Sequence, residues 1–220
     1  MRGGVSPEVP NDTYQALLAL YVFGSRFAAG KRVLDLGCGT GYGSARLASA
    51  GVEVVGLDAD EGKLSYARKK FPNVRFVQGS AENPPADLGT FGLILAVDLL
   101  PHLQSPNLVV EWAVRHLEPE GTFVASVPPI VDERTMEQHK GSGLHRMSLY
   151  LWNWESLFRR RFKEVKLFGA FPPDGARLDL SDPSPSRVRA EDFRFDEVSP
   201  ANPATAGSLS AVLVGSGQTG

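Results

Sequence analysis

The sequence predicts a single α/β domain in which helices cover both faces of a mostly parallel sheet. Three observations carry this prediction. Short strand-like segments alternate with helical ones along residues 31–127, the spacing typical of βαβ units. The strand-like segments are apolar throughout rather than alternating, as in sheets buried on both faces. A glycine-rich turn joins the first strand to the next helix.

The chain begins with a predicted helix at residues 12–29, which are amphipathic. Asn11 or Asp12 suits the N-cap, and Gly30 follows the helix end. Apolar runs bounded by glycine, proline or aspartate then define the next elements. The strands are expected at residues 31–36, 52–57, 74–78, 91–97 and 122–127, and the helices between them at residues 44–50, 61–71 and 107–117.

The later part of the chain is less regular. Residues 128–150 contain two consecutive prolines and two glycines, and we expect a long loop above the sheet. Residues 171–206 hold six prolines without clear periodicity, which is typical of a functional flap or a partly disordered segment. Phe193 and Phe195 alternate with charged residues there and allow a short hairpin. The other elements expected are a helix at 154–161, strands at 163–168 and 208–214, and a frayed tail at 215–220.

Composition excludes several classes of protein. The 220 residues are 42% hydrophobic and 22% charged, which is near the globular average and suits one domain over residues 1–220. A formal net charge of −2 argues against broad phosphate neutralisation on a nucleic acid. One cysteine excludes an intramolecular disulfide framework. No apolar run is long enough for a bilayer span, and the first residues lack the apolar region of a signal peptide, so we expect a cytoplasmic protein.

The strongest chemical signal is the segment 33–43, VLDLGCGTGYG, which follows a predicted strand and precedes a predicted helix. Glycines in such a turn adopt positive φ and let the backbone approach a ligand closely. Asp58 ends the next strand, where a carboxylate accepts hydrogen bonds from ribose hydroxyls in nucleotide-binding folds. The combination predicts a nucleotide-cofactor site. The plain alternative is a tight turn whose glycines serve only chain reversal.

Two other nucleotide-binding loops fit less well. A P-loop needs Gly-Lys followed by Ser or Thr, whereas Gly41 is followed by Tyr42 and Gly43. A dinucleotide loop has the spacing G-x-G-x-x-G, whereas the glycines from Gly37 to Gly41 give G-x-G-x-G. This disfavours a nicotinamide-dependent dehydrogenase.

The segment 33–43 resembles motif I of the class I S-adenosylmethionine-dependent methyltransferases, in particular those of type 11. The resemblance extends over roughly residues 12–170 and 208–214. It implies a Rossmann-like sheet of seven strands with the last one antiparallel, S-adenosylmethionine as the cofactor, and a core at residues 31–170 and 208–214. The cofactor contacts that it implies are Tyr21, Asp35, Gly37, Cys38, Gly39, Gly41, Asp58, Ala59, Ser80, Ala81 and Val97.

Several of these positions carry a specific implication. By the resemblance, Asp58 binds the ribose, Ala59 lies beside the adenine, and Cys38 is a small packing residue rather than a nucleophile. Ser80 stands where the family usually has Asp, which weakens the expected contact to the adenine amino group. Gly92, after Phe91, likewise replaces a familiar Asp.

A finer resemblance links the chain to bacterial methyltransferases of sugar and polysaccharide pathways. It rests on Tyr21, on the segment around the glycine turn, and on His145, which keeps the histidine of an Asn-Pro-Phe-His segment but not the Asn-Pro. It implies that Tyr21 closes over the methionine end of the cofactor.

Histidines supply the candidates for acid–base work, because their pKa suits a base near neutral pH. His145 is the first candidate for the catalytic base and His139 the second; the alternative is that both are exposed loop residues. His102 follows the fourth strand at the edge where α/β sheets bind ligands, and we expect it and Trp152 to contact the substrate unless they serve packing. No metal site is expected, since Asp132 and its acidic neighbours match no metal-ligand spacing.

The resemblance implies methyl transfer to an oxygen or nitrogen of a small-molecule acceptor, such as a sugar or a secondary metabolite. The alternatives are a non-catalytic or regulatory cofactor-binding protein of the same fold, and a methyltransferase acting on nucleic acid or protein. The expected partner is the small acceptor, with no nucleic acid and no membrane; a homodimer is left open.

Overall fold

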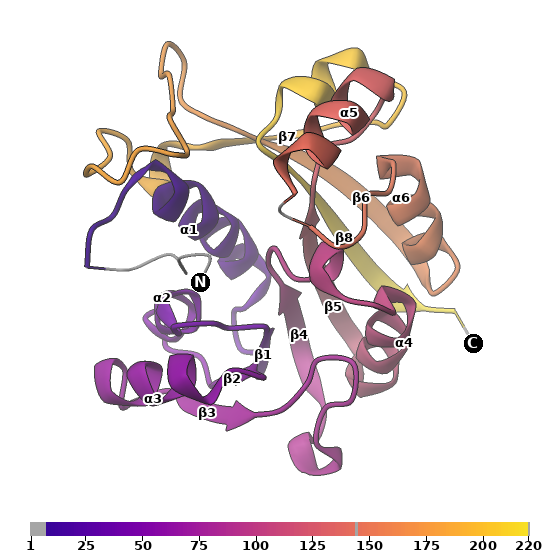
Figure 1. Cartoon of the computed structure of the whole chain (residues 1–220). Helices are drawn as coiled ribbons and strands as arrows, with labels where there is room; N and C mark the ends of the chain where they lie inside the picture. The colour runs from indigo at the N-terminus through magenta and orange to yellow at the C-terminus, as the bar shows by residue number, and fades with distance from the viewer. Residues whose placement is uncertain (1–7, 144, 220) are drawn as a thin grey trace.

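The computed structural model describes residues 8–143 and 145–219, which form one sheet with helices on both of its faces (Figure 1). The sheet has eight strands in the order β3-β2-β1-β4-β5-β8-β6-β7. The strands are β1 (Val33–Leu36), β2 (Val54–Asp58), β3 (Arg75–Gln78), β4 (Phe91–Ala96), β5 (Leu117–Val127), β6 (Phe162–Phe171), β7 (Arg194–Glu197) and β8 (Ser210–Gln218). The α-helices are α1 (Asp12–Gly24), α2 (Tyr42–Ala48), α3 (Glu61–Lys70), α4 (Pro106–His116), α5 (Glu133–Ser142) and α6 (Leu151–Arg159).

The strand directions confirm the predicted fold class. β3, β2, β1, β4 and β5 run parallel, and β8 pairs antiparallel with both β5 and β6. The expectation of seven strands is one too few, because β7 adds an antiparallel strand to the free edge of β6 with Phe168 opposite Glu197. β7 lies where Phe193 and Phe195 allowed a hairpin.

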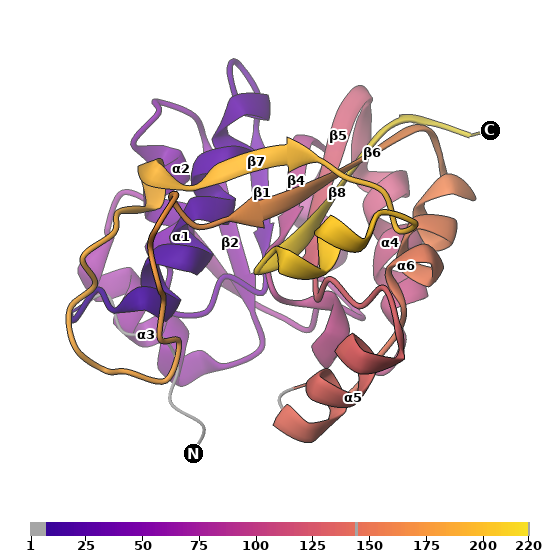
Figure 2. The same cartoon turned by 90° about the horizontal axis from the view of Figure 1, so that it is seen from above.

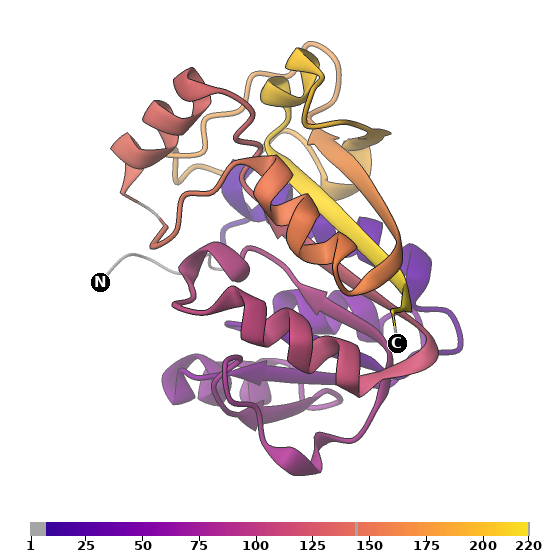
Figure 3. The same ribbon diagram turned by 90° about the vertical axis from the view of Figure 1, so that its right-hand side faces the viewer.

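Two apolar layers hold the helices against the sheet. One layer contains buried residues of α1, α2 and α3, such as Phe23, Leu47 and Leu64. The other contains buried residues of α4 and α6, such as Trp112 and Trp154, and Figure 3 shows these two helices together in front of the sheet. Because successive strand residues point to opposite faces, the strands are buried on both sides, which explains their apolar composition.

The expected loop at 128–150 is wrong in its centre, because residues 133–142 form α5. Asp132 begins this helix with a capping box: its Oδ1 accepts from the backbone N–H of Thr135 at 2.8 Å, and Thr135 Oγ1 accepts from the N–H of Asp132 at 3.0 Å. Two single-turn helices lie beside strands: η3 (Leu100–His102) follows β4, and η4 (Ala190–Asp192) precedes β7.

The tail does not fray where expected, since β8 continues to Gln218, which lies opposite Phe162. Gly220 lies outside the described residues. Pairing with β6 supplies hydrogen-bond partners for main-chain groups of this segment.

The middle of the proline-rich segment, residues 179–190, lies beside α1 (Figure 2), whereas residues 194–197 form β7 on the edge of β6. The backbone N–H of Asp179 donates to Asp12 at 2.8 Å, and the hydroxyl of Thr13 donates to the carbonyl of Leu180 at 2.6 Å. η4 packs its buried Ala190 against α1. The segment is therefore joined by hydrogen bonds to the helix that precedes β1. No helix of the described residues is both long and apolar enough to cross a bilayer.

Candidate functional site

A cavity of about 410 Å³ opens at the carboxyl ends of the parallel strands, the edge at which open α/β sheets bind ligands. Its walls come from the turns after β1, β2 and β4 and from α1. Seven of the residues predicted from the sequence line it: Tyr21, Gly37, Cys38, Gly39, Asp58, Val97 and His102. The volume lies within the range of small-molecule and cofactor sites, roughly 300–1,000 Å³.

The glycine turn after β1 forms the floor of the cavity. Gly37 has φ +74°, a conformation that favours glycine, and a Cβ there would lie 2.7 Å from the Leu99 side chain, which would have to shift. Gly39 has φ +55°, and a Cβ there would meet no atom within 4 Å. Since Gly39 lines the cavity, a side chain would project into space that a ligand can use. The turn thus presents bare backbone to the cavity.

Asp58 connects the end of β2 to this turn. Its Oδ2 accepts from the N–H of Gly39 at 2.8 Å and its Oδ1 accepts from the N–H of Asp60 at 2.9 Å. A carboxylate has about four lone-pair sites, so after these two bonds it keeps capacity for two donors. The side chain borders the cavity and can therefore accept hydrogen bonds from a diol.

Asp35 lies beneath the glycine turn rather than in the cavity wall. It is fully buried, and its two oxygens accept from the hydroxyls of Tyr21 at 3.2 Å and Ser44 at 2.6 Å. Burial raises the pKa of Asp35 to about 6, although the hydrogen bonds from Ser44 and Tyr21 oppose this. Asp35 therefore joins α1, β1 and α2 under the turn.

Cys38 is buried within the turn. Burial, assisted by the charges of Asp35 and Asp58, raises the pKa of its thiol well above the usual range. The neutral thiol is a weak nucleophile, which agrees with a packing role.

The other predicted cofactor contacts lie around the cavity without lining it. Gly41 packs against Phe76 and Ala67. Ala59 directly follows Asp58, and Ser80 and Ala81 follow β3, the strand beside β2. Ala81 is buried, and Ser80 Oγ accepts from the N–H of Glu82 at 3.2 Å. These positions border the Asp58 end of the site, and their contact with a cofactor stays a prediction.

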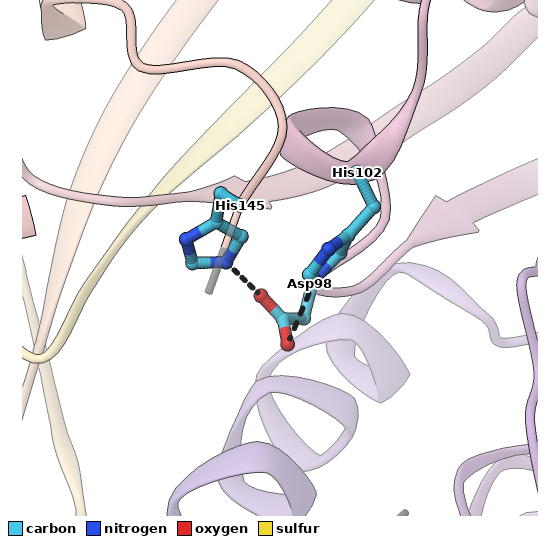
Figure 4. Close-up of side chains that lie close together, drawn as sticks. All are labelled: Asp98, His102 and His145. Carbon is cyan, nitrogen blue, oxygen red and sulfur yellow. Dashed lines mark hydrogen bonds and ion pairs between the residues drawn. The ribbon is translucent and has the colours of Figure 1, made fainter. Parts of the chain in front are cut away.

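Asp98, which was not among the predicted site residues, lines the cavity with His102, and His145 lies beside them (Figure 4). His145 Nε2 lies 3.3 Å from Asp98 Oδ1, and His102 Nε2 lies 3.8 Å from Oδ2. Burial raises the pKa of Asp98, but the neighbouring imidazoles, first His102 and then His145, outweigh burial and lower it to about 2. His139 stacks on His145, with ring centres 4.7 Å apart.

The backbone holds Asp98 in an unusual conformation. Its φ is +50°, the one positive value among the non-glycine residues that the structure describes, and its N–H donates to Ser126 Oγ at 2.8 Å. Such conformations cost free energy and concentrate at functional sites. A polar residue at the end of β4, four positions before His102, was the signal in the sequence that could have identified it.

The remaining predicted substrate residue, Trp152, lies on the surface of α6. Its ring stacks on Tyr150 with centres 4.0 Å apart, and it is not among the residues that line the cavity. His139 and His145 do not line it either, so their catalytic role and the substrate role of Trp152 stay predictions. Asp132 caps α5, and Glu133 accepts a hydrogen bond from the Tyr150 hydroxyl. These two acidic residues therefore stabilise α5 and the segment after it.

Comparison with known proteins places the chain among methyltransferases. A family model described as a methyltransferase domain matches residues 33–121. YqeM of Bacillus subtilis (strain 168), named as a methyltransferase, is 32% identical over 171 residues, which span 64% of this chain and 68% of YqeM. The ubiquinone biosynthesis O-methyltransferase of Aromatoleum aromaticum is 36% identical over 98 residues, covering 42% of each chain.

The extent of these matches differs between relatives. The aligned part spans only about two fifths of the length of several other curated relatives. Among solved structures, a SAM-dependent methyltransferase of Thermotoga maritima superimposes with a TM-score of 0.69 at 19% identity, covering 93% of this chain and 90% of that one. At this identity the likeness shows a shared fold.

Proposed function

Because the chain belongs to the class I S-adenosylmethionine-dependent methyltransferases, we propose that it transfers a methyl group from this cofactor to an oxygen or nitrogen of a small-molecule acceptor. The observation that carries the proposal is one cavity lined by two chemically distinct groups. The glycine turn and Asp58 follow β1 and β2, whereas Asp98 and His102 follow β4, which lies on the other side of β1 from β2.

The residues of the first group fit S-adenosylmethionine. Bare backbone at Gly39 leaves room for the methionine portion, and the two spare acceptor sites on Asp58 suit the two hydroxyls of the ribose. Tyr21, held by Asp35 in the wall of the cavity, would limit the space beside the methionine portion. Each of these features is available without rearranging the turn.

Methyl transfer from a sulfonium requires the protein mainly to align the acceptor atom with the methyl group. When bound, S-adenosylmethionine supplies a methyl group already activated by its positive sulfur, so no covalent enzyme intermediate is needed. The task of this chain is to hold the acceptor atom in line with that methyl and to exclude water. Val97 and Leu99 give apolar contact and Asp98 and His102 give polar contact in the part of the cavity where an acceptor would lie.

A small acceptor suits the size and charge of the site. The volume of about 410 Å³ is in the range of small-molecule sites, and the formal charge of −2 on the chain does not favour a nucleic-acid acceptor. The relative that acts in ubiquinone biosynthesis is named as an O-methyltransferase, which supports an oxygen acceptor for this chain.

The test follows labelled methyl into acceptors of different size. The full chain is incubated with methyl-labelled S-adenosylmethionine and either a small-molecule extract or separate nucleic-acid and protein fractions. Asp58→Asn is the control, since it leaves Asp98 and His102 in place. Label that enters the small-molecule fraction, and does so less with the control variant, supports the proposal. Label confined to macromolecules would contradict it.

A further inference from the structure

We propose that Asp98, His102 and His145 bind a divalent first-row transition-metal ion beside the cofactor cavity. One donor atom from each of these side chains lies within 4.8 Å of the other two. Figure 4 shows both imidazoles turned toward the same carboxylate, His102 from η3 and His145 from the segment between α5 and α6. No single stretch of sequence contains this group, which the fold assembles across 47 positions.

The spacing of the donor atoms suits an ion with bonds of about 2 Å. Three points within 4.8 Å of one another share a centre that is no more than about 2.8 Å from each. Zinc binds histidine nitrogen and carboxylate oxygen at about 2.0–2.2 Å. Each ligand atom therefore needs to move by less than ~1 Å to reach such a bond, which side-chain rotation on a half-exposed site can supply.

The donor set selects the class of metal. Two imidazoles and one carboxylate are the ligands of catalytic zinc sites and of other first-row sites that keep open positions. Magnesium and calcium prefer carboxylate, carbonyl and water oxygens, so they fit this group poorly. With three protein ligands, the ion would keep at least one position for water or substrate.

Several backbone contacts hold the ligands in place. The N–H of Met147 donates to the carbonyl of Pro101 at 2.9 Å, which fixes the segment carrying His145 against η3, which carries His102. The N–H of Asp98 donates to Ser126 Oγ. The side chain of His145 is only 11% exposed, whereas those of Asp98 and His102 are 46% and 42% exposed. The open side of the group therefore faces the cavity that Asp98 and His102 line.

The position of the ion suggests what it does, and this step rests on the proposed function. An acceptor hydroxyl bound to the ion would lose its proton to solvent more readily, because a bound cation lowers the pKa of its ligand. The oxygen lone pair would then form the new O–CH₃ bond as the C–S bond breaks and leaves its electron pair on sulfur. The site thus favours hydroxyl acceptors over amines.

The metal site can be tested without any methyl acceptor. The full chain, freed of metal by a chelator, is titrated with Zn²⁺ by calorimetry and with Co²⁺ by visible absorption. We expect one ion per chain and cobalt bands typical of four or five ligands. Asp98→Asn, His102→Gln and His145→Gln should each weaken binding by about ten-fold or more, since even residues behind the ligands contribute 10–100-fold.

His116→Gln is the matched control. His116 is on α4, where it stacks on Trp112 and its Nδ1 contacts the Trp112 carbonyl at 2.8 Å, so its loss should leave binding unchanged. Circular dichroism identifies any variant that fails to fold. In that case the Zn²⁺ affinities of the other two ligand variants test the proposal. Absence of Zn²⁺ binding, tighter binding of Mg²⁺, or equal binding by all the ligand variants would overturn the proposal.

A further comparison separates this proposal from the proposed function. Binding of S-adenosylhomocysteine is measured on the metal-free chain, and methyl transfer is measured with and without added Zn²⁺. Metal binding without methyl transfer to small molecules would contradict the proposed function alone. Methyl transfer with no metal binding would contradict the metal site alone and leave the histidines to act as bases.

Discussion

Replacing Gly39 with alanine would place a methyl group directly in the cofactor cavity. Gly39 has φ +55°, and the new Cβ would meet no protein atom within 4 Å. The backbone cost of this conformation for an L-residue is roughly 1–2 kcal/mol. For a chain of this size each kcal/mol lowers the melting temperature by about 2–4 °C. The protein should therefore still fold while its binding surface changes.

Gly30→Ala provides a control matched in backbone strain. Gly30 has φ +70°, a Cβ there also meets nothing within 4 Å, and the residue does not line the cavity. We expect both variants to lose similar stability in thermal unfolding. In calorimetry with S-adenosylhomocysteine, Gly39→Ala should bind about ten-fold more weakly or worse, a loss of ~1.4 kcal/mol. Gly30→Ala should bind like the parent, and equal affinities for the two variants would refute the assigned position of the cofactor.

Three other substitutions test separate parts of the account. Asp58→Asn should weaken binding of S-adenosylhomocysteine by about 1.5–3 kcal/mol, the range for hydrogen bonds to a charged group, as measured by calorimetry; an unchanged affinity would remove the ribose assignment. Asp35→Asn tests a pH effect, because folding raises the pKa of Asp35 from 3.8 to about 6. The protonated carboxyl contributes fully to the unfolding free energy below pH ~4. As the pH rises through 6, the unfolding free energy should fall by roughly 3 kcal/mol. Urea titrations of parent and variant across this window should show the fall only in the parent, and parallel curves would contradict it. Ser126→Ala removes the acceptor of the Asp98 N–H and should cost about 1 kcal/mol of stability in urea unfolding; an unchanged unfolding free energy would argue against a role for Ser126 in holding Asp98.

The cofactor half of the site was predictable because its parts lie close together in the sequence. The glycine turn lies directly after β1, and Asp58 ends the next strand, so strand order alone brings them to one edge. The parallel strands were predictable because burial on both faces leaves them almost wholly apolar. The observed ends of these strands differ from the expected ends by no more than two residues, except in β5, which begins five residues earlier than expected, at Leu117.

α5 and β7 were harder to predict because tertiary contacts define them. α5 has few apolar residues and buries Met136 but little else, so it lacks the periodicity that marks a helix. The capping box of Asp132 and Thr135 was its main local signal. The alternation of Phe193 and Phe195 with charged residues signalled a short strand at β7, but its pairing with the free edge of β6 is a tertiary contact that the sequence does not show.

The histidine cluster could be predicted only in part. His102 and His145 were each expected near the site, but their meeting at Asp98 depends on the contact between Met147 and Pro101. Such a contact joins two loops whose separation in sequence carries no information about distance. The acceptor end of the site is therefore where the structure adds most.

The most direct test of the central claim is calorimetric titration of the full chain with S-adenosylhomocysteine and, separately, with a nicotinamide dinucleotide. We predict binding of one S-adenosylhomocysteine per chain, weakened by Asp58→Asn, and no binding of the dinucleotide. Binding of the dinucleotide in place of S-adenosylhomocysteine would contradict the account.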